Sequence, residues 1–229
     1  MKKPKIAILY GFPGAGKDTQ AEILEENLNF TQVSSSYLIE KKIFDSNLQN
    51  DPIIKYQKEL YESGKLCDPE WVTKIINEEV VELHQEGRNL VFSGSPRTLY
   101  ESENEIPYWE DLYGKDNIFV FLIKISEETS IFRNTHRRIC SVCHHPIVYS
   151  EESKNLKFCP LCGGELKKRG LDTKELMKVR VKEYKERTEP IFNYLKERGY
   201  QVIEIDGEVS PNEVAKQIIK HIPNGEVED

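Results

Sequence analysis

The chain has 229 residues, of which 38% are hydrophobic and 31% charged, and its net charge is -7. This length suffices for one compact domain with small insertions. The acidic balance argues against a nucleic-acid surface, because binding to the phosphodiester backbone needs clustered Lys and Arg. No apolar run approaches the roughly 18 residues of a membrane span, and the apolar stretch at residues 6–10 is too short for a signal peptide. We therefore expect a cytoplasmic protein with reduced thiols and no membrane partner.

Short apolar runs separated by amphipathic stretches predict a parallel β-sheet covered by helices on both faces. The runs that predict strands are residues 6–10, 89–92, 118–125 and 201–205. A helix is expected from Asp18 onward, with Ala21, Leu24 and Leu28 on its apolar face. Residues 172–198 predict a second, long helix that Pro190 breaks or kinks.

Two segments interrupt this alternation of strands and helices. Residues 34–64 are polar and helical in pattern, and they predict no strand. Residues 136–170 contain four cysteines, short β-prone pieces and many turn residues. Both segments are predicted to be excursions from the central sheet.

Residues 11–19, with the sequence GFPGAGKDT, have the pattern of a phosphate-binding loop. Glycines let successive backbone N–H groups point at phosphate oxygens, and the helix that follows adds its positive N-terminal end. Lys17 would reach the β- and γ-phosphates of a nucleotide. The strict pattern asks for Ser or Thr directly after the lysine, but here Asp18 takes that place, so Thr19 is expected to hold magnesium. The alternative, a glycine turn with a surface lysine, is disfavoured because a predicted strand and helix flank the loop.

Four cysteines form two pairs, Cys140-x-x-Cys143 and Cys159-x-x-Cys162, with fifteen residues between the pairs. This spacing is typical of a zinc site, and a closed shell of four thiolates indicates a structural rather than catalytic metal. Two disulfides are the alternative, which a reducing compartment disfavours. The spacing does not distinguish zinc from iron. The remaining cysteine, Cys67, is expected to be a small buried apolar residue.

The phosphate loop, the GSPRT motif at residues 94–98, the cysteine pairs and the surrounding arginines together resemble adenylate kinase in its zinc-lid form. Further matches, in the same order, are residues 64–66, 162–166 and 205–207. The resemblance implies a P-loop NTPase fold with a central parallel sheet, a helical acceptor-binding insertion and a zinc-stapled, β-rich lid. It also implies Mg-assisted, in-line transfer from ATP to AMP under a closing lid, by a monomer. The implied subdivision is a core of residues 1–33, 68–135 and 172–229, an acceptor subdomain of residues 34–67 and a lid of residues 136–171.

Phosphoryl transfer depends on positioning and on neutralising negative charge, and Arg offers bidentate contacts to phosphate that Lys cannot make. The resemblance makes Arg97 the clamp on the acceptor phosphate and Arg133 the residue that stacks on the ATP adenine. The implied catalytic set is Lys17, Arg97, Arg137, Arg169 and Arg180. The residues expected to bind ATP and its phosphates are Gly14, Ala15, Gly16, Lys17, Asp18, Thr19, Arg133, Arg137 and Gly207. The residues expected to bind the acceptor are Ser35, Lys65, Cys67, Gly94, Arg97, Glu101, Arg169 and Arg180.

Two departures from the family pattern concern charge. The aspartate that usually precedes the Gly-x-Pro-Arg motif, and holds magnesium through its waters, is Ser93 here. We expect metal affinity or rate to suffer, because a hydroxyl brings no charge. The arginine that usually grips the monophosphate is replaced by Glu40, although Lys41 or Lys42 could take its role after a one-residue shift.

Two further departures concern the acceptor base and the lid. The glutamine that usually reads the adenine of AMP is Glu101, and an ionised carboxylate can only accept hydrogen bonds, which suits guanine better than adenine. A lid aspartate of the family is Leu171 here, with Asp172 retained beside it.

The favoured hypothesis is an ATP-dependent nucleoside monophosphate kinase with AMP as acceptor. Three alternatives remain, in decreasing order: a kinase for a guanine or pyrimidine mononucleotide, a nucleotide-binding relative with low turnover, and a zinc-ribbon nucleic-acid binder. The sequence does not decide the acceptor base, the rate or the oligomeric state.

Overall fold

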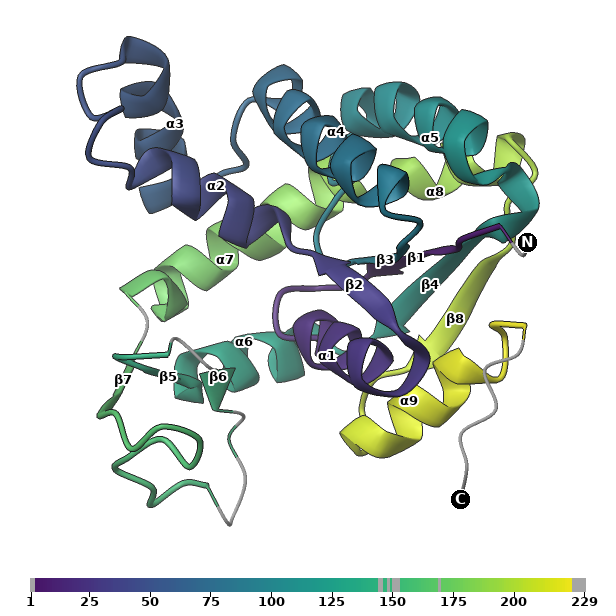
Figure 1. Ribbon diagram of the computed structural model, residues 1–229. Coiled ribbons are helices and arrows are strands. Elements are labelled where there is room, and N and C mark those ends of the chain that lie inside the picture. Colours follow the sequence, from purple (N-terminus) through teal and green to yellow (C-terminus); the bar gives the residue numbers. More distant parts are fainter. Residues whose placement is uncertain (1–2, 144–145, 148, 150–152, 169, 224–229) are drawn as a thin grey trace.

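The computed structural model describes residues 3–143, 146–147, 149, 153–168 and 170–223. Its centre is a parallel sheet with the strand order β2-β3-β1-β4-β8 (Figure 1). The strands are β1 (Ile6–Tyr10), β2 (Phe30–Val33), β3 (Asn89–Phe92), β4 (Ile118–Lys124) and β8 (Val202–Asp206). The parallel sheet expected from the sequence is therefore confirmed.

Strand β2 was not predicted from the sequence. It lies at the edge of the sheet and pairs only with β3 among the described strands. Its end residues Phe30 and Val33 are buried, whereas Thr31 and Gln32 between them are partly exposed. An edge strand this short and half polar lacks the continuous apolar run that marks the central strands.

Helices cover both faces of the sheet, and each face has its own apolar core (Figure 1). On β1 the side chains alternate, so Ile6 and Ile8 belong to one core and Ala7 and Leu9 to the other. The helices over the first face are α4 (Pro69–Gln85), α5 (Leu99–Tyr113) and α8 (Ile191–Glu197). The helices over the second face are α1 (Lys17–Leu28) and α9 (Pro211–Ile219), and the short turn η1 (Lys115–Asn117) joins α5 to β4. No helix in the described part of the chain is long and apolar enough to cross a membrane.

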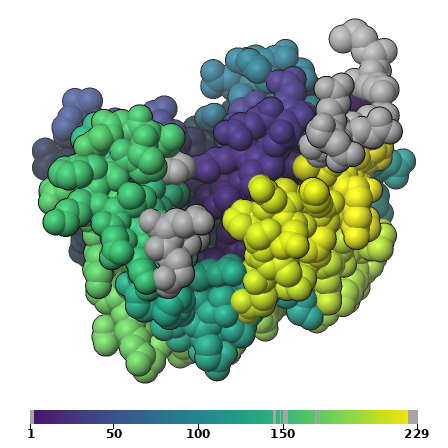
Figure 2. Space-filling model, turned by 90° about the horizontal axis from the view of Figure 1, so that it is seen from below, coloured from purple at the N-terminus to yellow at the C-terminus, as the bar shows by residue number. Residues whose placement is uncertain are grey.

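Two groups of elements project from the sheet on the side where its strands end (Figure 1). The first is the helix pair α2 (Ser35–Ile43) and α3 (Pro52–Glu62). The second is a small antiparallel sheet of β5 (Arg138–Cys140), β6 (Pro146–Ile147) and β7 (Leu166–Lys168), entered from α6 (Glu127–His136) and left through η2 (Gly170–Asp172). Figure 2 shows this small sheet, in green, and α9, in yellow, on either side of the purple N-terminal part of the chain.

The long helix expected over residues 172–198 is divided, as Pro190 predicted. Helix α7 (Lys174–Glu183) continues into the π-helical turn η3 (Tyr184–Thr188), which Pro190 follows before α8 begins. The wider turn is closed by Glu189 N, which donates to the Tyr184 carbonyl at 3.0 Å. Such π-turns are frequent at functional sites, and this one lies beside the cleft described below.

Ile8 tests how much the sheet depends on its central strand. Its side chain is fully buried, so Ile8→Ala should lower the free energy of unfolding by about 2–5 kcal/mol. Ile53→Ala is the matched control, because Ile53 is 56% exposed and its loss should cost no more than about 0.5 kcal/mol. Urea denaturation measures both values, and equal losses would contradict the assigned core.

Candidate active site

The phosphate loop, residues 11–16, leaves β1 at the carboxyl edge of the sheet and turns into α1. In open parallel sheets this edge is where ligands bind. Gly14 and Gly16 have φ angles of 79° and 94°, which favour glycine. A Cβ on Gly14 would lie 2.3 Å from the Asn134 Nδ2 atom, so the loop cannot take a larger residue there without a shift. Local backbone freedom and close packing against α6 therefore shape the loop.

Lys17 folds back onto this loop. Its Nζ atom donates hydrogen bonds to the carbonyls of Gly11, at 2.8 Å, and Phe12, at 2.9 Å. Burial, together with the positive charge of Arg97, lowers the pKa of Lys17 to about 7. A bound phosphate would raise this pKa again, because a nearby negative charge favours the ammonium form.

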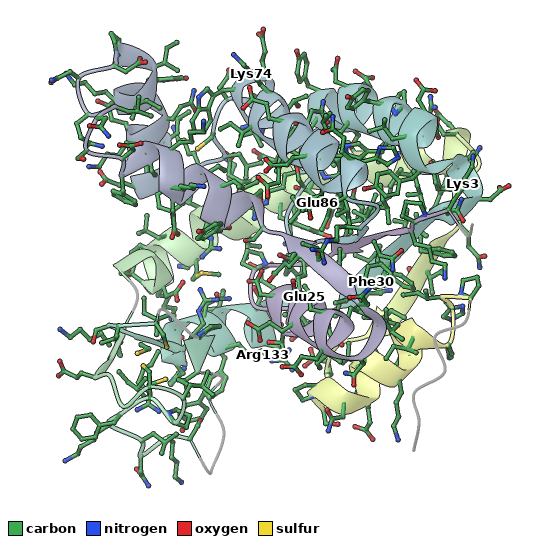
Figure 3. All side chains as sticks on the ribbon, in the orientation of Figure 1. Lys3, Glu25, Phe30, Lys74, Glu86 and Arg133 are labelled. Atoms are coloured by element: carbon green, nitrogen blue, oxygen red, sulfur yellow. The ribbon has the colours of Figure 1, made fainter. Side chains whose placement is uncertain are left out.

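A cavity opens beside the phosphate loop, and Arg133 borders it from α6. The Arg133 guanidinium donates to the carbonyls of Gly14, at 3.4 Å, and Gly207, at 3.0 Å. Figure 3 labels Arg133 among the side chains of the structure. All nine residues expected to bind ATP line this cavity: Gly14, Ala15, Gly16, Lys17, Asp18, Thr19, Arg133, Arg137 and Gly207. Tyr149 from the lid segment lines the same cavity.

Two of the expected catalytic arginines meet at one buried carboxylate. Arg137 makes a bidentate contact with Asp172, from Nε to Oδ2 and from Nη2 to Oδ1, both at 2.9 Å. Arg180 Nη1 lies 3.3 Å from Asp172 Oδ1. The Asp172 side chain is only 3% exposed, so it counters both cations in a poorly solvated place. This contact joins the start of the lid to α7.

A second cavity lies between β3, α2 and the loop after α3. Six of the expected acceptor residues line it: Ser35, Lys65, Cys67, Gly94, Arg97 and Glu101. Arg97 is held there by Nε, which donates to the Gly94 carbonyl at 2.5 Å, and by Nη2, which lies 3.4 Å from Ser36 Oγ. Thr188, at the end of η3, donates to the Arg97 carbonyl at 2.7 Å.

Two buried glutamates lie beneath the acceptor cavity, on consecutive turns of α5. Glu101 accepts hydrogen bonds from Arg97 N, at 2.6 Å, and from Thr98 Oγ1, at 3.0 Å. Glu105 is fully buried and accepts from Thr73 Oγ1 at 3.2 Å and Ser95 Oγ at 3.1 Å. Burial raises the pKa of both carboxyl groups, and the charge of Glu101 adds to the increase at Glu105. Burial therefore favours the protonated form of both carboxyl groups, and most strongly that of Glu105.

The four lid cysteines bring their sulfurs within 4.8 Å of one another. The Sγ atoms of Cys140 and Cys162 are 3.4 Å apart, and those of Cys143 and Cys159 are 3.7 Å apart. These distances exceed the roughly 2.05 Å of a disulfide, so the disulfide alternative was wrong. They fit a tetrahedral zinc thiolate shell, in which sulfurs are about 3.8 Å apart for Zn–S bonds of about 2.3 Å. A Cβ on Gly164 would lie 2.7 Å from Cys140 Sγ, so a glycine is needed behind the cluster.

Comparison with known proteins agrees with this geometry. The family profile described as "Adenylate kinase" matches residues 9–200, most of the chain. The chain belongs to the adenylate kinase family. It is 35% identical to an adenylate kinase of Mycoplasma capricolum subsp. capricolum, over 92% of this chain and 96% of that protein. An adenylate kinase of Borrelia recurrentis is 31% identical, over 94% and 95%, and one of Chlamydia trachomatis is 28% identical, over 95% and 90%.

Within this adenylate kinase architecture, Arg180 and Lys17 line the cleft that separates the two cavities. The same cleft is bordered by Arg97, so these three cations lie around one space. Arg169, which was expected to serve both catalysis and acceptor binding, lies outside the described residues. The side chain of Leu171, at the position of a family lid aspartate, is likewise outside them. The roles of all these residues remain predictions.

The structure shows the surroundings of Glu40, which stands where the family usually has a phosphate-binding arginine. Glu40 accepts a hydrogen bond from the Tyr61 hydroxyl, and Lys41 and Lys42 are exposed and do not line the acceptor cavity. A shift that would make either lysine the missing phosphate ligand is therefore not seen. Among the residues that the structure describes, Lys65 and Arg97 bring positive charge to the acceptor cavity.

Several residues of the site escaped sequence analysis. Gln32 lies on the unpredicted strand β2 and contacts Ser93 Oγ through its Nε2 atom at 2.7 Å. Tyr149 follows a short lid strand, and Thr188 lies in a π-turn that no local pattern marks. Glu105 could have been found, because a glutamate one helical turn after Glu101 on an amphipathic helix shares its buried face.

Glu105→Gln should make stability less sensitive to alkaline pH. The folded chain holds the Glu105 proton above the ordinary pKa of 4.5, whereas the unfolded chain releases it. Wild-type stability therefore falls as pH rises from about 4.5 toward the raised pKa, and the glutamine removes this loss. Between pH 5 and pH 8 the free energy of unfolding of the variant should therefore rise relative to that of wild type.

Urea denaturation at several pH values measures this difference. The control is Glu103→Gln, since Glu103 is exposed on the same helix. A parallel pH response of wild type and Glu105→Gln would contradict the protonated state of Glu105.

Proposed function

We propose that this chain transfers the terminal phosphoryl group of ATP to AMP, with the donor in the phosphate-loop cavity and the acceptor beside Glu101. The observation that carries the proposal is that the central cleft shares lining residues with the cavity on either side. Lys17 borders both the phosphate-loop cavity and the central cleft, and Arg97 borders both the cleft and the acceptor cavity. Two nucleotides bound at the two ends would direct their phosphates toward each other, as in-line transfer requires.

The chain's cations would stabilise the charge that spreads over the transferred group. Each of them now has a partner that a phosphate could replace: loop carbonyls for Lys17, the Gly94 carbonyl for Arg97, and Asp172 for Arg137 and Arg180. These cations already lie around the cleft before substrate binds, and phosphate oxygens would take the place of their present partners. Arg169 is proposed to join this set from the lid.

Magnesium is implied by the family and suits the donor side. The hydroxyl of Thr19 and the carboxylate of Asp18 are hard oxygen donors on the wall of the phosphate-loop cavity. When bound, the ion would neutralise charge on the nucleotide's phosphate oxygens. The chain itself would hold the nucleotide and exclude water. We propose that residues 136–171 close over the nucleotide as a lid and that residues 34–67 bind the acceptor. The remaining residues would form the core.

Glu101 can serve an adenine base if it is neutral. Burial raises the pKa of Glu101, which favours the protonated carboxyl. A protonated carboxyl has one donor and one acceptor, the same pattern as an amide, and so matches adenine N1 and the exocyclic amine. An ionised Glu101 would instead favour the donors on a guanine edge. The names of the relatives support AMP.

Nucleotide phosphorylation by the purified protein tests the proposed function. With ATP and Mg²⁺, AMP should yield ADP, whereas GMP, CMP and UMP should yield little diphosphate. Lys17→Ala should abolish transfer, since the Lys17 ammonium would contact the phosphates of ATP at the border between the phosphate-loop cavity and the central cleft. The KM for AMP should rise with pH in wild type, because the carboxyl form of Glu101 is lost, and this rise should be absent in Glu101→Gln.

A preference for GMP or a pyrimidine nucleotide, or a pH-independent KM for AMP in wild type, would contradict this assignment of Glu101. Tight ATP binding without any product would favour a nucleotide-binding relative of low turnover.

We also propose that Cys140, Cys143, Cys159 and Cys162 bind one structural zinc ion. In the described part of this segment, three short strands and few buried apolar side chains surround the cluster, so the metal would stabilise the lid. Elemental analysis should find one zinc per chain, and Cys159→Ser should lower both zinc content and thermal stability. The control is Cys67→Ser, outside the cluster, which should leave zinc content unchanged; iron in place of zinc, or a full zinc content in Cys159→Ser, would contradict the site.

A cytoplasmic, monomeric enzyme is proposed as well. Reduced thiols are needed for metal binding, and the family is typically monomeric.

A further inference from the structure

We propose that Asp18 supplies the carboxylate that holds the hydrated magnesium ion of the donor nucleotide, in place of the neutral Ser93 at the end of β3. Asp18 stands where the strict phosphate-loop pattern has a hydroxyl residue. The inference rests on the proposed function, because it concerns the metal that would accompany ATP.

The position of Asp18 suits this role. It lies in the first turn of α1, directly after Lys17, and is exposed. Among the described residues that line the phosphate-loop cavity, it is the only one with a carboxylate. It also lines the groove between α1 and α2 that adjoins this cavity, so a hydrated ion could reach it from solvent.

Asp18 and Ser93 belong to one polar cluster joined by Gln32. The Gln32 Nε2 atom lies 2.7 Å from Ser93 Oγ and 3.4 Å from Asp18 Oδ1, so one nitrogen separates the two oxygens. Ser93 is 3% exposed and carries no charge. The negative charge of this cluster is therefore on Asp18 of α1, and Gln32 of β2 lies between it and Ser93, which directly follows β3.

A carboxylate at Asp18 can hold Mg²⁺ through the water molecules that the ion keeps. Mg²⁺ dehydrates reluctantly and usually keeps several waters while it binds phosphate oxygens and one or two protein groups. A carboxylate can accept hydrogen bonds from those waters without touching the ion, which tolerates a displacement of a few ångströms. The hydroxyls of Thr19 and Ser93 and the Gln32 amide would then be neutral partners of the same shell.

A carboxylate in this place also has an electrostatic cost. Without a divalent ion, Asp18 repels the polyphosphate that Lys17 and the helix N-terminus attract. With the ion bound, the repulsion becomes attraction. Asp18 should therefore couple nucleotide binding to metal binding, and its neutralisation should change the two affinities in opposite directions. A residue with a purely structural role would not produce this reversal.

The test measures binding without turnover, in the zinc-loaded protein and without an acceptor. Isothermal titration calorimetry with ATP in EDTA gives metal-free affinity, and electron paramagnetic resonance gives Mn²⁺ affinity for the protein–ATP complex. Asp18→Asn should tighten metal-free ATP roughly three- to tenfold and weaken Mn²⁺ binding by a similar factor, as one screened charge at short range would do. The matched control is Glu22→Gln, which removes the same charge one turn later on α1, from the groove but not from the phosphate-loop cavity.

A second substitution sharpens the result. Ser93→Asp in the Asp18→Asn background should restore Mn²⁺ affinity to within about twofold of wild type, because it returns a carboxylate to the same cluster. Unchanged Mn²⁺ affinity in Asp18→Asn, or equal effects of Asp18→Asn and Glu22→Gln, would overturn the role of Asp18 while leaving ATP binding intact. A wild-type chain that binds no ATP with or without Mn²⁺ would instead overturn the proposed function.

Discussion

The convergence of positive charge on one cleft is the constraint on which the site depends. Lys17, Arg97 and Arg180 line the same space in a chain whose net charge is negative. Such cations repel one another, and burial adds to the cost, as the lowered pKa of Lys17 shows. The fold meets this cost locally, with carbonyl oxygens around Lys17 and with Asp172 between Arg137 and Arg180. A phosphate that enters the cleft would relieve the same repulsion.

The acceptor side shows the complementary arrangement of negative charge. Glu101 and Glu105 lie on consecutive turns of α5 and share a poorly solvated region below the cavity. Two ionised carboxylates would be unfavourable there, so the pair favours a retained proton. Hydroxyls from Thr73, Ser95 and Thr98 satisfy the carboxyl oxygens. The base-reading position is therefore governed by its protonation state as well as by its residue type.

Neighbouring residues and burial can compensate for two departures of this chain from the adenylate kinase pattern. At Glu101, burial can restore the hydrogen-bonding pattern of an amide. At Ser93, the absent charge has a neighbour in Asp18, which Gln32 brings into the same cluster. The cluster of Asp18, Gln32 and Ser93 joins residues that are distant in sequence, whereas at Glu101 the burial of the side chain is set by the fold. Residue-by-residue comparison with a family motif does not reveal these compensations.

The sequence by itself determined the central parallel sheet, the phosphate loop and the cysteine cluster, because each is set by local patterns: buried apolar runs, glycine conformations and ligand spacing. It also predicted the break before α8 from Pro190. Only the tertiary structure decided the edge strand β2, the sharing of Asp172 by two arginines and the pairing of buried glutamates. Their energies depend on burial from solvent and on contacts with residues far away in the sequence, and a short stretch of sequence predicts neither.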